Sequence, residues 1–336
     1  MSSITLASGR NSRLSLRPLQ GAVSTIAAKF PFFWGVILML AANSLWALAY
    51  VAPLALPEAS AVEIALGRFI VYGLLSAVLL DLALVARLPF SMLALGVLFA
   101  LAGNVAYYLL LVIGIQLSGA AMAVLIIGML PVTIALVGQL QTDPRALRRL
   151  AFPLALFGGG LILFNAAKTD FFGDPSQVSW VGLLCVIGSL IMWTWYALAN
   201  GRFLRQTKVV SAAQWSSIVG LGSFVVAAII LPFSWWLGLA RDPTSLTEAE
   251  LSRIAIWSIL LGGGSTWLGT VLFNKASKLL AISVVGQLIV FEAVFGMFYL
   301  FVISGGLPSP VELLGIAIAI FAVWLSIRRL QSGKAR

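Results

Sequence analysis

The 336-residue chain is 61% hydrophobic and only 10% charged, which excludes an ordinary soluble domain, because soluble domains carry charges on about 25% of their residues. Histidine is absent and Cys185 is the single cysteine, so a histidine-based metal centre, a Ser-His-Asp triad and an intrachain disulfide are excluded. The 21 Lys and Arg residues outnumber the 11 Asp and Glu residues, which gives a formal net charge of +10. The composition predicts an all-α integral membrane protein without a cofactor.

Residues 1–29 form a polar, serine-rich segment that contains Arg10, Arg13 and Arg17 and no acidic residue. We interpret this segment as a flexible cytoplasmic tail. An organellar transit peptide has the same composition and stays open as an alternative. A cleaved signal peptide is disfavoured, because the apolar run from Pro31 to Pro53 is longer than an h-region of roughly 7 to 15 residues.

Ten apolar stretches follow the tail, and each is long enough to cross most or all of a hydrocarbon core of roughly 30 Å as a helix. Every linker between them is short, so the sequence has no room for a soluble domain. The predicted transmembrane helices are Pro31 to Pro53, Ala61 to Leu80, Phe90 to Gly114, Ser118 to Leu140, Leu150 to Ala167, Val178 to Asn200, Ala212 to Leu237, Ile254 to Phe273, Leu279 to Ile303, and Val311 to Ile327.

The basic residues are unevenly distributed between the two sides of the membrane. If the N-terminus is cytoplasmic and every span crosses, all Lys and Arg residues fall in cytoplasmic segments except Lys168, Arg241, Arg253 and the intramembrane Arg68. Cytoplasmic loops of membrane proteins are enriched in Lys and Arg. We therefore expect a multi-pass protein of the cell inner (plasma) membrane with both termini cytoplasmic. The positive charge reflects orientation rather than nucleic-acid binding.

The two halves of the chain resemble one another weakly. Trp46 in the first span matches Trp193 in the sixth at a shift of 147 residues, and residues 103–132 resemble residues 264–294 at a shift of 161 or 162. Five helices per half would invert the second half relative to the first, and inverted repeats are typical of transporters with a site near the midplane. The predicted divisions are the tail 1–29, a first five-helix repeat 30–170, a second five-helix repeat 177–328, and a cytoplasmic C-terminal tail 329–336.

Glu292 is the single acidic residue of the predicted helix from Leu279 to Ile303. A charge near the middle of a membrane helix is costly unless it faces protein or water, so it is a functional-site hypothesis by default. We predict that Glu292 binds a proton, a cation or the amine of a substrate. The structural alternative is a glutamate that shares a proton or hydrogen bond with a neighbouring helix.

Arg68 lies about five residues inside the outer end of the second span. Its long stem would let the guanidinium snorkel toward the membrane surface, or pair with Glu63 or Glu292. We favour these interpretations over the functional alternative, in which the guanidinium fork clamps the carboxylate of a substrate.

Polar and aromatic side chains recur at helical spacing within several spans, which predicts a cavity that could stack a flat or aromatic solute. The structural alternative is hydrogen bonding between helices, because Ser, Thr, Asn and Gln commonly bond across membrane helices. The candidate lining residues are Asn43, Trp46, Tyr50, Asn104, Tyr107, Tyr108, Trp193, Tyr196, Thr266, Thr270 and Gln287.

Pro131, in the middle of the fourth span, predicts a helix kink, because proline frees a backbone carbonyl. A kink that faces the cavity could be a gating point, and a static bend is the alternative. The glycine runs 158–160 and 262–264 lack the Lys and Ser/Thr of a phosphate-binding loop and instead predict close helix packing or bending.

Several short motifs are similar to those of the drug/metabolite transporter superfamily, specifically its EamA-type permeases. They are Leu45-Trp46-Ala47, Leu66-Gly67-Arg68-Phe69, the hairpin from Ala121-Met122-Ala123-Val124-Leu125 to Leu130-Pro131-Val132, and the hairpin from Ala281-Ile282-Ser283-Val284-Val285 to Phe291-Glu292-Ala293-Val294-Phe295. The sequence departs from the family at Ala293, where proline is usual, and it lacks the glutamate that often ends that helix.

The resemblance implies that helices one to four and six to nine surround a central cavity, with helices five and ten at the periphery. It also implies secondary transport, most often the export of amino acids, metabolites or amphipathic drugs. The many tryptophans and tyrosines suggest a narrower resemblance to amino acid exporters of the YddG type.

We therefore predict a secondary active transporter of the inner membrane that exports small organic solutes by alternating access, driven by a gradient or by exchange. Its expected partners are a small-molecule substrate and the lipid bilayer, with no nucleic acid and no obligate protein partner. The alternatives are an integral-membrane channel, which would want a more polar pore, and a membrane scaffold without transport. An enzyme is disfavoured, because Glu292 and Arg68 are the only deep charged candidates.

Overall fold

The computed structural model describes residues 30–80, 85–140, 146–166, 179–207, 209–280 and 288–332. Within these ranges the regular secondary structure is helical, and no strand is present. Six of the described helices are long and apolar enough to cross a membrane, and three shorter apolar helices accompany them. The prediction of an all-α protein is therefore confirmed for the described residues.

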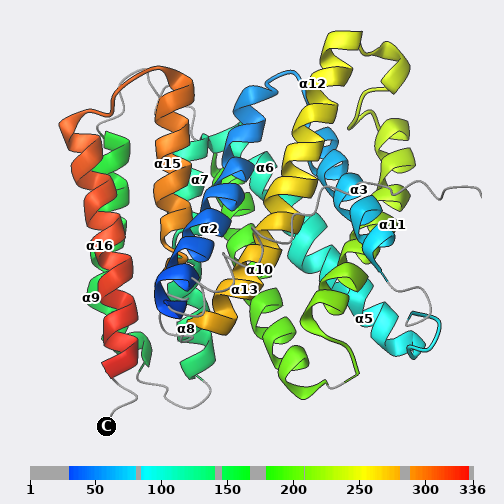
Figure 1. The fold of residues 1–336 in the computed structure, drawn as a ribbon. Helices are drawn as coiled ribbons and strands as arrows, with labels where there is room; N and C mark the ends of the chain where they lie inside the picture. The colour runs from blue at the N-terminus through cyan, green and yellow to red at the C-terminus, as the bar shows by residue number, and fades with distance from the viewer. Residues whose placement is uncertain are drawn as a thin grey trace, which may run out of the picture.

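The helices follow one another with short connections (Figure 1). The first half of the chain contains α2 (Pro31–Ala55), α3 (Ala61–Leu79), α5 (Phe90–Ala100), η1 (Leu101–Val105), α6 (Ala106–Ser118), α7 (Ala120–Ile127), α8 (Leu130–Leu140) and α9 (Ala146–Ala166). The second half contains α10 (Trp180–Gln206), α11 (Ala212–Trp236), η3 (Pro243–Ser245), α12 (Glu248–Ile259), η4 (Leu260–Leu268), α13 (Gly269–Leu279), α15 (Phe291–Ser304) and α16 (Pro310–Ser332).

Two of the long helices contain a π-helical segment, η1 in the third predicted span and η4 in the eighth. Such segments are rare and occur frequently at functional sites. Glycine permits a close approach at η4, where a Cβ on Gly262 would lie 2.5 Å from the carbonyl oxygen of Arg68. The segments lie in the regions of the two halves that resemble one another in sequence.

Two predicted spans are not continuous helices, which corrects the expectation from hydropathy. The fourth span is divided by a turn at Gly128 and Met129, between α7 and α8. In the ninth, α15 begins only at Phe291, directly after a turn at residues 289–290, while residue 279 ends α13. The turns at 128–129 and 289–290 are 161 residues apart, the shift that relates the two halves.

The break in the fourth span also changes the position of Pro131. This residue lies in the first turn of α8 rather than in the middle of a helix, so its missing N–H removes no helical hydrogen bond. The turn before it closes its own backbone bonds, with the N–H of Gly128 donating to Val124 and that of Met129 donating to Ile126. Pro131 is therefore not the cause of the break in the fourth span.

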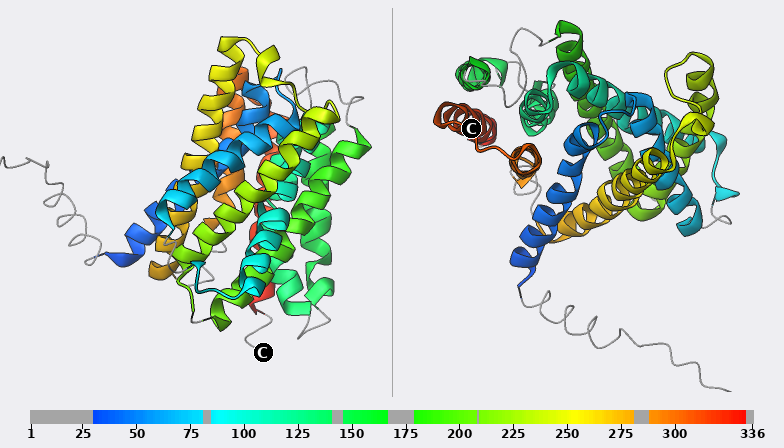
Figure 2. Two further views of the ribbon diagram at one scale, coloured as in Figure 1. Left: turned by 90° about the vertical axis from the view of Figure 1, so that its right-hand side faces the viewer. Right: turned by 90° about the horizontal axis from the view of Figure 1, so that it is seen from above.

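The helices of the two halves interleave. Helix α2 packs between α13 and α15, α10 packs against α6, α7 and α8, and α3 packs along α11 (Figure 1). Helices α9 and α16 lie side by side at one edge of the molecule, as the view from above in Figure 2 shows. Gly160 and Gly315 allow this pair to approach closely, because a Cβ on either would lie within 3.0 Å of the other helix's backbone.

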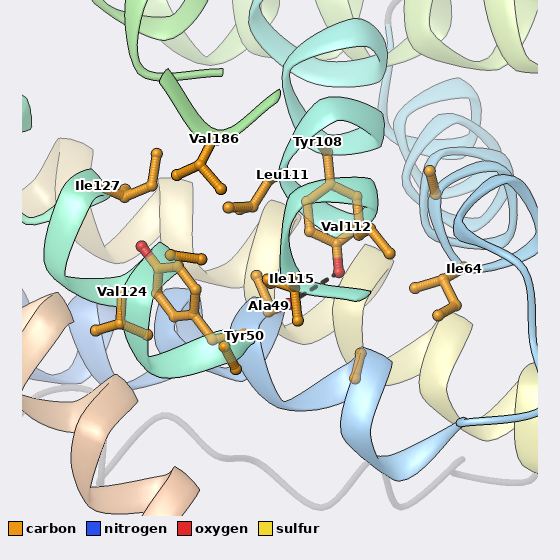
Figure 3. Close-up of a cluster of buried hydrophobic side chains, with 14 of the residues drawn as sticks. Ala49, Tyr50, Ile64, Tyr108, Leu111, Val112, Ile115, Val124, Ile127 and Val186 are labelled. Atoms are coloured by element: carbon orange, nitrogen blue, oxygen red, sulfur yellow. Dashed lines mark hydrogen bonds between the residues drawn. The ribbon is translucent and has the colours of Figure 1, made fainter. Parts of the chain in front are cut away.

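A buried cluster joins α2, α6, α7 and α10 at the centre of the molecule (Figure 3). The hydroxyl of Tyr108 donates a hydrogen bond to the carbonyl of Ala49, so the one polar group of this fully buried ring is satisfied. The surrounding side chains are Tyr50, Leu111, Val112, Ile115, Val124, Ile127 and Val186.

Candidate functional site

A cavity of about 530 Å³ lies among α2, α3, η1, α6, α8, α10, α11, η4, α13 and α15. Its volume falls within the roughly 300 to 1,000 Å³ of typical small-molecule sites. Both halves of the chain contribute to its walls, and no described residue of α9 or α16 does. The cavity contains two oppositely charged side chains, Arg68 and Glu292.

Arg68 is buried on α3, with 8% of its surface exposed. Its Nε donates to Thr266 Oγ1 at 2.8 Å, and that hydroxyl donates in turn to the carbonyl of Leu261 in η4. The guanidinium carbon lies 4.1 Å above the ring of Tyr108, a cation–π arrangement. Nη1 is buried and has no hydrogen-bond partner among the described residues.

This placement makes the snorkelling interpretation of Arg68 wrong. The side chain is turned inward because Thr266 and the Tyr108 ring hold it there, and Glu63 is not its partner. The Glu63 carboxylate instead binds Arg241. Arg68 therefore lies at the cavity wall, and its Nη1 is a buried donor without a partner among the described residues.

Glu292 lies in the first turn of α15, next to the break in the ninth span. Its Oε1 accepts a hydrogen bond from the hydroxyl of Tyr50 on α2 at 3.0 Å. The N-terminal end of a helix favours a negative charge. Within the described part of the chain Oε2 has no hydrogen-bond donor, and the carboxylate forms no ion pair with Arg68 within 4.0 Å. The expected contact with a neighbouring helix thus exists, and the side chain still faces the cavity.

Aromatic rings form much of the remaining wall. Tyr107 and Trp193 have ring centroids 6.4 Å apart, and Trp193 and Tyr196 have centroids 6.2 Å apart. The ring of Tyr196 lies directly over Gly103 in η1, where a Cβ would overlap it. Trp46 lies over Gly269 in the same way, because a Cβ there would lie 2.7 Å from the indole nitrogen.

One end of the cavity lies between the last turns of α10 and the first turn of α11. Polar side chains are found there, and Trp215 Nε1 donates to Asn200 Oδ1 at 2.7 Å. Asn274 on α13 and Ser216 on α11 complete this part of the wall. In Figure 1 this is the lower end of the molecule, where α16 also ends.

Ion pairs hold the opposite end together. Arg241, in the connection between α11 and α12, binds Glu63 of α3 at 3.2 Å and Glu250 of α12 at 2.7 Å. These carboxylates raise the pKa of Arg241 by hydrogen bonding, Glu63 first. Arg253 binds Glu58 at 3.2 Å and donates to the carbonyl of Ala55 at the end of α2. We call these two arginines and three glutamates the ion-pair cluster.

The cavity gathers most of the predicted site residues. Those that line it are Trp46, Arg68, Asn104, Tyr107, Trp193, Tyr196, Thr266, Thr270 and Glu292.

Four predicted site residues among the described ones do not line the cavity. Asn43 donates to the carbonyl of Leu288 at 2.6 Å, next to the break in the ninth span, while Tyr50 and Tyr108 support Glu292 and Arg68 from behind. Pro131 is also not at the wall, although its neighbour Leu130 is. Gln287 lies outside the described residues.

Sequence reasoning missed Tyr72, Ser216 and Trp215 at the wall. Tyr72 follows Arg68 by four residues and shares its helix face, so the spacing contained the signal. Its hydroxyl donates to the carbonyl of Ser216, which links α3 to α11. Trp215 lies near the beginning of α11 and is only 1% exposed.

The helical fold and the charged central cavity define a polytopic membrane protein with a solute-sized internal site. The chain belongs to the family of inner membrane protein YtfF of Escherichia coli (strain K12). The two are 31% identical over 309 residues, which cover 88% of this chain and 95% of the relative. The relative's name confirms the expectation of an inner-membrane protein.

A solved crystal structure has the same fold. It superposes with a TM-score of 0.57 at 18% sequence identity, over 87% of this chain and 96% of the other. No protein-family model matches the chain.

Proposed function

We propose that the protein is a secondary active transporter that moves a small organic solute across the inner membrane by alternating access. The observation that carries this proposal is the asymmetry of the cavity. It reaches from two buried charges toward one end of the helices, while the ion-pair cluster holds the opposite end together.

Paired features of the two halves support an inverted repeat of five plus five helices and membership of the EamA-type permeases. The turns at 128–129 and 289–290 break corresponding spans, and π-helical segments interrupt the spans before them. The first helix of each half packs against helices of the other half, since α2 contacts α13 and α15 while α10 contacts α6, α7 and α8. Broken helices at corresponding positions are typical of transporter binding sites.

The distribution of charge supports an orientation for this state. Exposed basic residues, including Arg202, Lys275 and Arg328, lie near the helix ends on the same side as the open end of the cavity. By the positive-inside rule that end is cytoplasmic, as are both chain termini. In this proposal the open end of the cavity faces the cytoplasm, and export begins with binding from that side.

The test is transport into everted membrane vesicles supplied with a uniformly ¹³C-labelled cell extract, so that no substrate is assumed. Under an imposed proton gradient, vesicles that contain the protein should accumulate particular labelled solutes above the external concentration, measured by mass spectrometry. We expect Glu292→Gln to abolish this concentrative accumulation, because it removes the only acidic group at the cavity wall among the described residues. Glu248→Gln, an exposed carboxylate outside the cavity, is the matched control.

The outcomes separate the alternatives. Accumulation that stops at the external concentration identifies a channel, and no accumulation relative to protein-free vesicles identifies a scaffold. Equal concentrative accumulation in wild type and Glu292→Gln would keep the transporter and remove Glu292 from coupling.

A further inference from the structure

The helix pair of α9 and α16 carries four arginines at one end, the lower end in Figure 1. Arg148 and Arg149 lie in the first turn of α9, and Arg328 and Arg329 lie near the C-terminal end of α16. Arg329 Nη1 donates a hydrogen bond of 3.3 Å to the carbonyl of Arg149, so the two helix ends meet. We call these four residues the arginine cluster. It is separate from the central cavity, whose walls contain no described residue of α9 or α16.

Basic residues far outnumber acidic ones around this cluster. The sequence of residues 143–149 and 324–336 contains seven Lys and Arg residues and one acid, Asp143, which lies outside the described residues. In the described part of the helix pair, the acidic residue is Glu312, at the opposite end of α16. The first turn of a helix is itself partly positive, so the arginines of α9 add charge of the same sign. An anion at this end is therefore electrostatically favourable.

Aromatic rings lie directly beside the cluster. The guanidinium carbon of Arg328 lies 4.4 Å from the centre of the Trp324 ring, and that of Arg329 lies 5.2 Å from the centre of the Phe152 ring on the other helix. Arg148 precedes Phe152 by four residues and shares its face of α9. A guanidinium that stacks on a ring through its flat face directs its N–H groups sideways, and this planar fork matches the oxygens of a phosphate group.

The rings next to the arginines are exposed at the surface of the helix pair. Phe152, Phe321 and Trp324 have 57%, 51% and 41% of their surface exposed, and the rings of Phe321 and Trp324 stack with centroids 5.4 Å apart. On a membrane helix, exposed apolar surface contacts hydrocarbon, and tryptophan is typical of the level of the lipid headgroups. The surface therefore combines positive charge with apolar faces one helical turn away.

We propose that this surface binds an anionic phospholipid, with its phosphate on the arginine cluster and its acyl chains along the rings of Phe152, Phe321 and Trp324. Clusters of about four to eight Lys and Arg residues next to a membrane helix are typical of anionic-lipid binding. A free phosphate ion or an acidic peptide would match the charges and leave the exposed rings without a partner. The site is distinct from the central cavity and does not depend on the transport function proposed above.

The experiment is native mass spectrometry of the purified full-length protein titrated with single lipids. Phosphatidylglycerol carries a net negative charge, and phosphatidylethanolamine with the same acyl chains carries none. We expect the first molecule of phosphatidylglycerol to bind at least about fivefold more tightly, which is the factor for one basic side chain near an anionic lipid. The preference should shrink as the ammonium acetate concentration is raised, because salt screens the charges.

A pair of double variants separates this site from the general positive charge of the same end of the molecule. Arg148→Gln with Arg328→Gln removes two exposed charges of the cluster. This variant should bind phosphatidylglycerol at least about fivefold more weakly and phosphatidylethanolamine as before. Arg202→Gln with Lys275→Gln removes two exposed charges at that end but outside the helix pair, so it is the matched control and should keep the lipid preference of wild type.

A variant that changes no charge tests the rings and replaces the double variant if that one does not fold. Trp324→Leu removes the ring beside Arg328 and should weaken phosphatidylglycerol by roughly two- to fivefold, the factor for loss of an exposed cation–π contact. Trp236→Leu is its matched control, because Trp236 is 82% exposed and lies at the end of α11 near the ion-pair cluster.

Three results would overturn the inference. The first is equal affinity of wild type for the two lipids. The second is an equal loss of phosphatidylglycerol binding in a cluster variant and in its matched control. The third is displacement of phosphatidylglycerol by an equal concentration of sn-glycerol 3-phosphate or octa-aspartate, which would assign the cluster to a free phosphate or to an acidic peptide.

Discussion

Arg68 illustrates how a single side chain acquires its role from residues far away in the sequence. Thr266, 198 positions later, accepts from its Nε, and Tyr108 of α6 supplies the ring below the guanidinium. Thr266 also donates to the carbonyl of Leu261, so its hydroxyl is oriented by η4 itself. The orientation of the cavity's positive charge therefore depends on one neutral hydroxyl group.

We predict that Thr266→Val weakens solute binding in the cavity by roughly 10- to 100-fold, the range for loss of a hydrogen bond to a charged group of about 1.5 to 3 kcal/mol, measured as the solute concentration for half-maximal accumulation in everted vesicles. Thr266→Ser retains the hydroxyl and is the control. Unchanged accumulation by Thr266→Val would show that Arg68 does not need this contact.

At the scale of the helices, the π-helical segment η1 brings a glycine under a cavity ring. Gly103 lies beneath Tyr196, and no side chain fits between them. In η4, Gly263 has no neighbouring atom within 4 Å of the place where a Cβ would be added. A methyl group at Gly103 of η1 would therefore overlap a neighbouring ring, whereas a methyl group at Gly263 of η4 would meet no neighbouring atom.

We expect Gly103→Ala to destabilise the protein by about 1 to 3 kcal/mol, because the added methyl group forces Tyr196 away from its position. Gly263→Ala should change the stability by less than about 0.5 kcal/mol. Thermal unfolding of the purified variants measures both effects. Equal melting temperatures for the two variants would contradict the packing of Tyr196 on η1.

For the helices, the sequence predicts where the apolar spans lie but does not predict where they are broken. Apolar runs such as that of α2 are predictable, because side-chain hydropathy determines which segments can cross a bilayer. The turns at 128–129 and 289–290 were not predicted, since Gly128 and Met129 are as compatible with an apolar run as their neighbours are. A broken membrane helix leaves backbone groups that need hydrogen-bond partners from elsewhere. Asn43 is such a partner, because it donates to the carbonyl of Leu288, and this contact is found only in the structure.

The same limit applies to the site. Its charged and aromatic members were predictable as residue types, because ionisable groups inside a membrane segment are rare. Which of them face the cavity depends on contacts between distant helices. Helical spacing alone therefore placed Trp193 and Tyr196 correctly and could not exclude Asn43.

At the scale of the whole molecule, the two ends of the helix assembly differ in how they are held. The ion-pair cluster joins α3, the connection between α11 and α12, and α12, and it also connects the end of α2 to α12. Exposed ion pairs contribute about 0.2 to 1 kcal/mol each, but Arg241 lies between two carboxylates and Glu63 is only 8% exposed. Loss of the Arg241 side chain should therefore shift the equilibrium between inward-open and outward-open states rather than unfold the protein.

We predict that Arg241→Gln shifts the protein toward an outward-open state by about 1 kcal/mol, or roughly fivefold in population. Ser216→Cys in a Cys185→Ser background places one thiol at the cavity wall. Labelling of this thiol by an impermeant reagent added to everted vesicles should slow in Arg241→Gln, by at most about fivefold, because the labelling rate follows the inward-facing fraction. Glu248→Gln is the control, and unchanged labelling in Arg241→Gln would show that the cluster does not govern access.

Glu63 and Glu250 each cap the start of a helix and also bind Arg241. In Glu63, Oε2 accepts from the N–H of Ser60 at the start of α3 and also from Arg241 Nη2, while Oε1 accepts from the backbone N–H and Nε of Arg241. In Glu250, Oε2 receives both donors of Thr247 at the start of α12, and Oε1 receives Arg241. The cap contacts with Ser60 and Thr247 do not involve Arg241. The ion pairs of Arg241 can therefore break and re-form without unwinding α3 or α12.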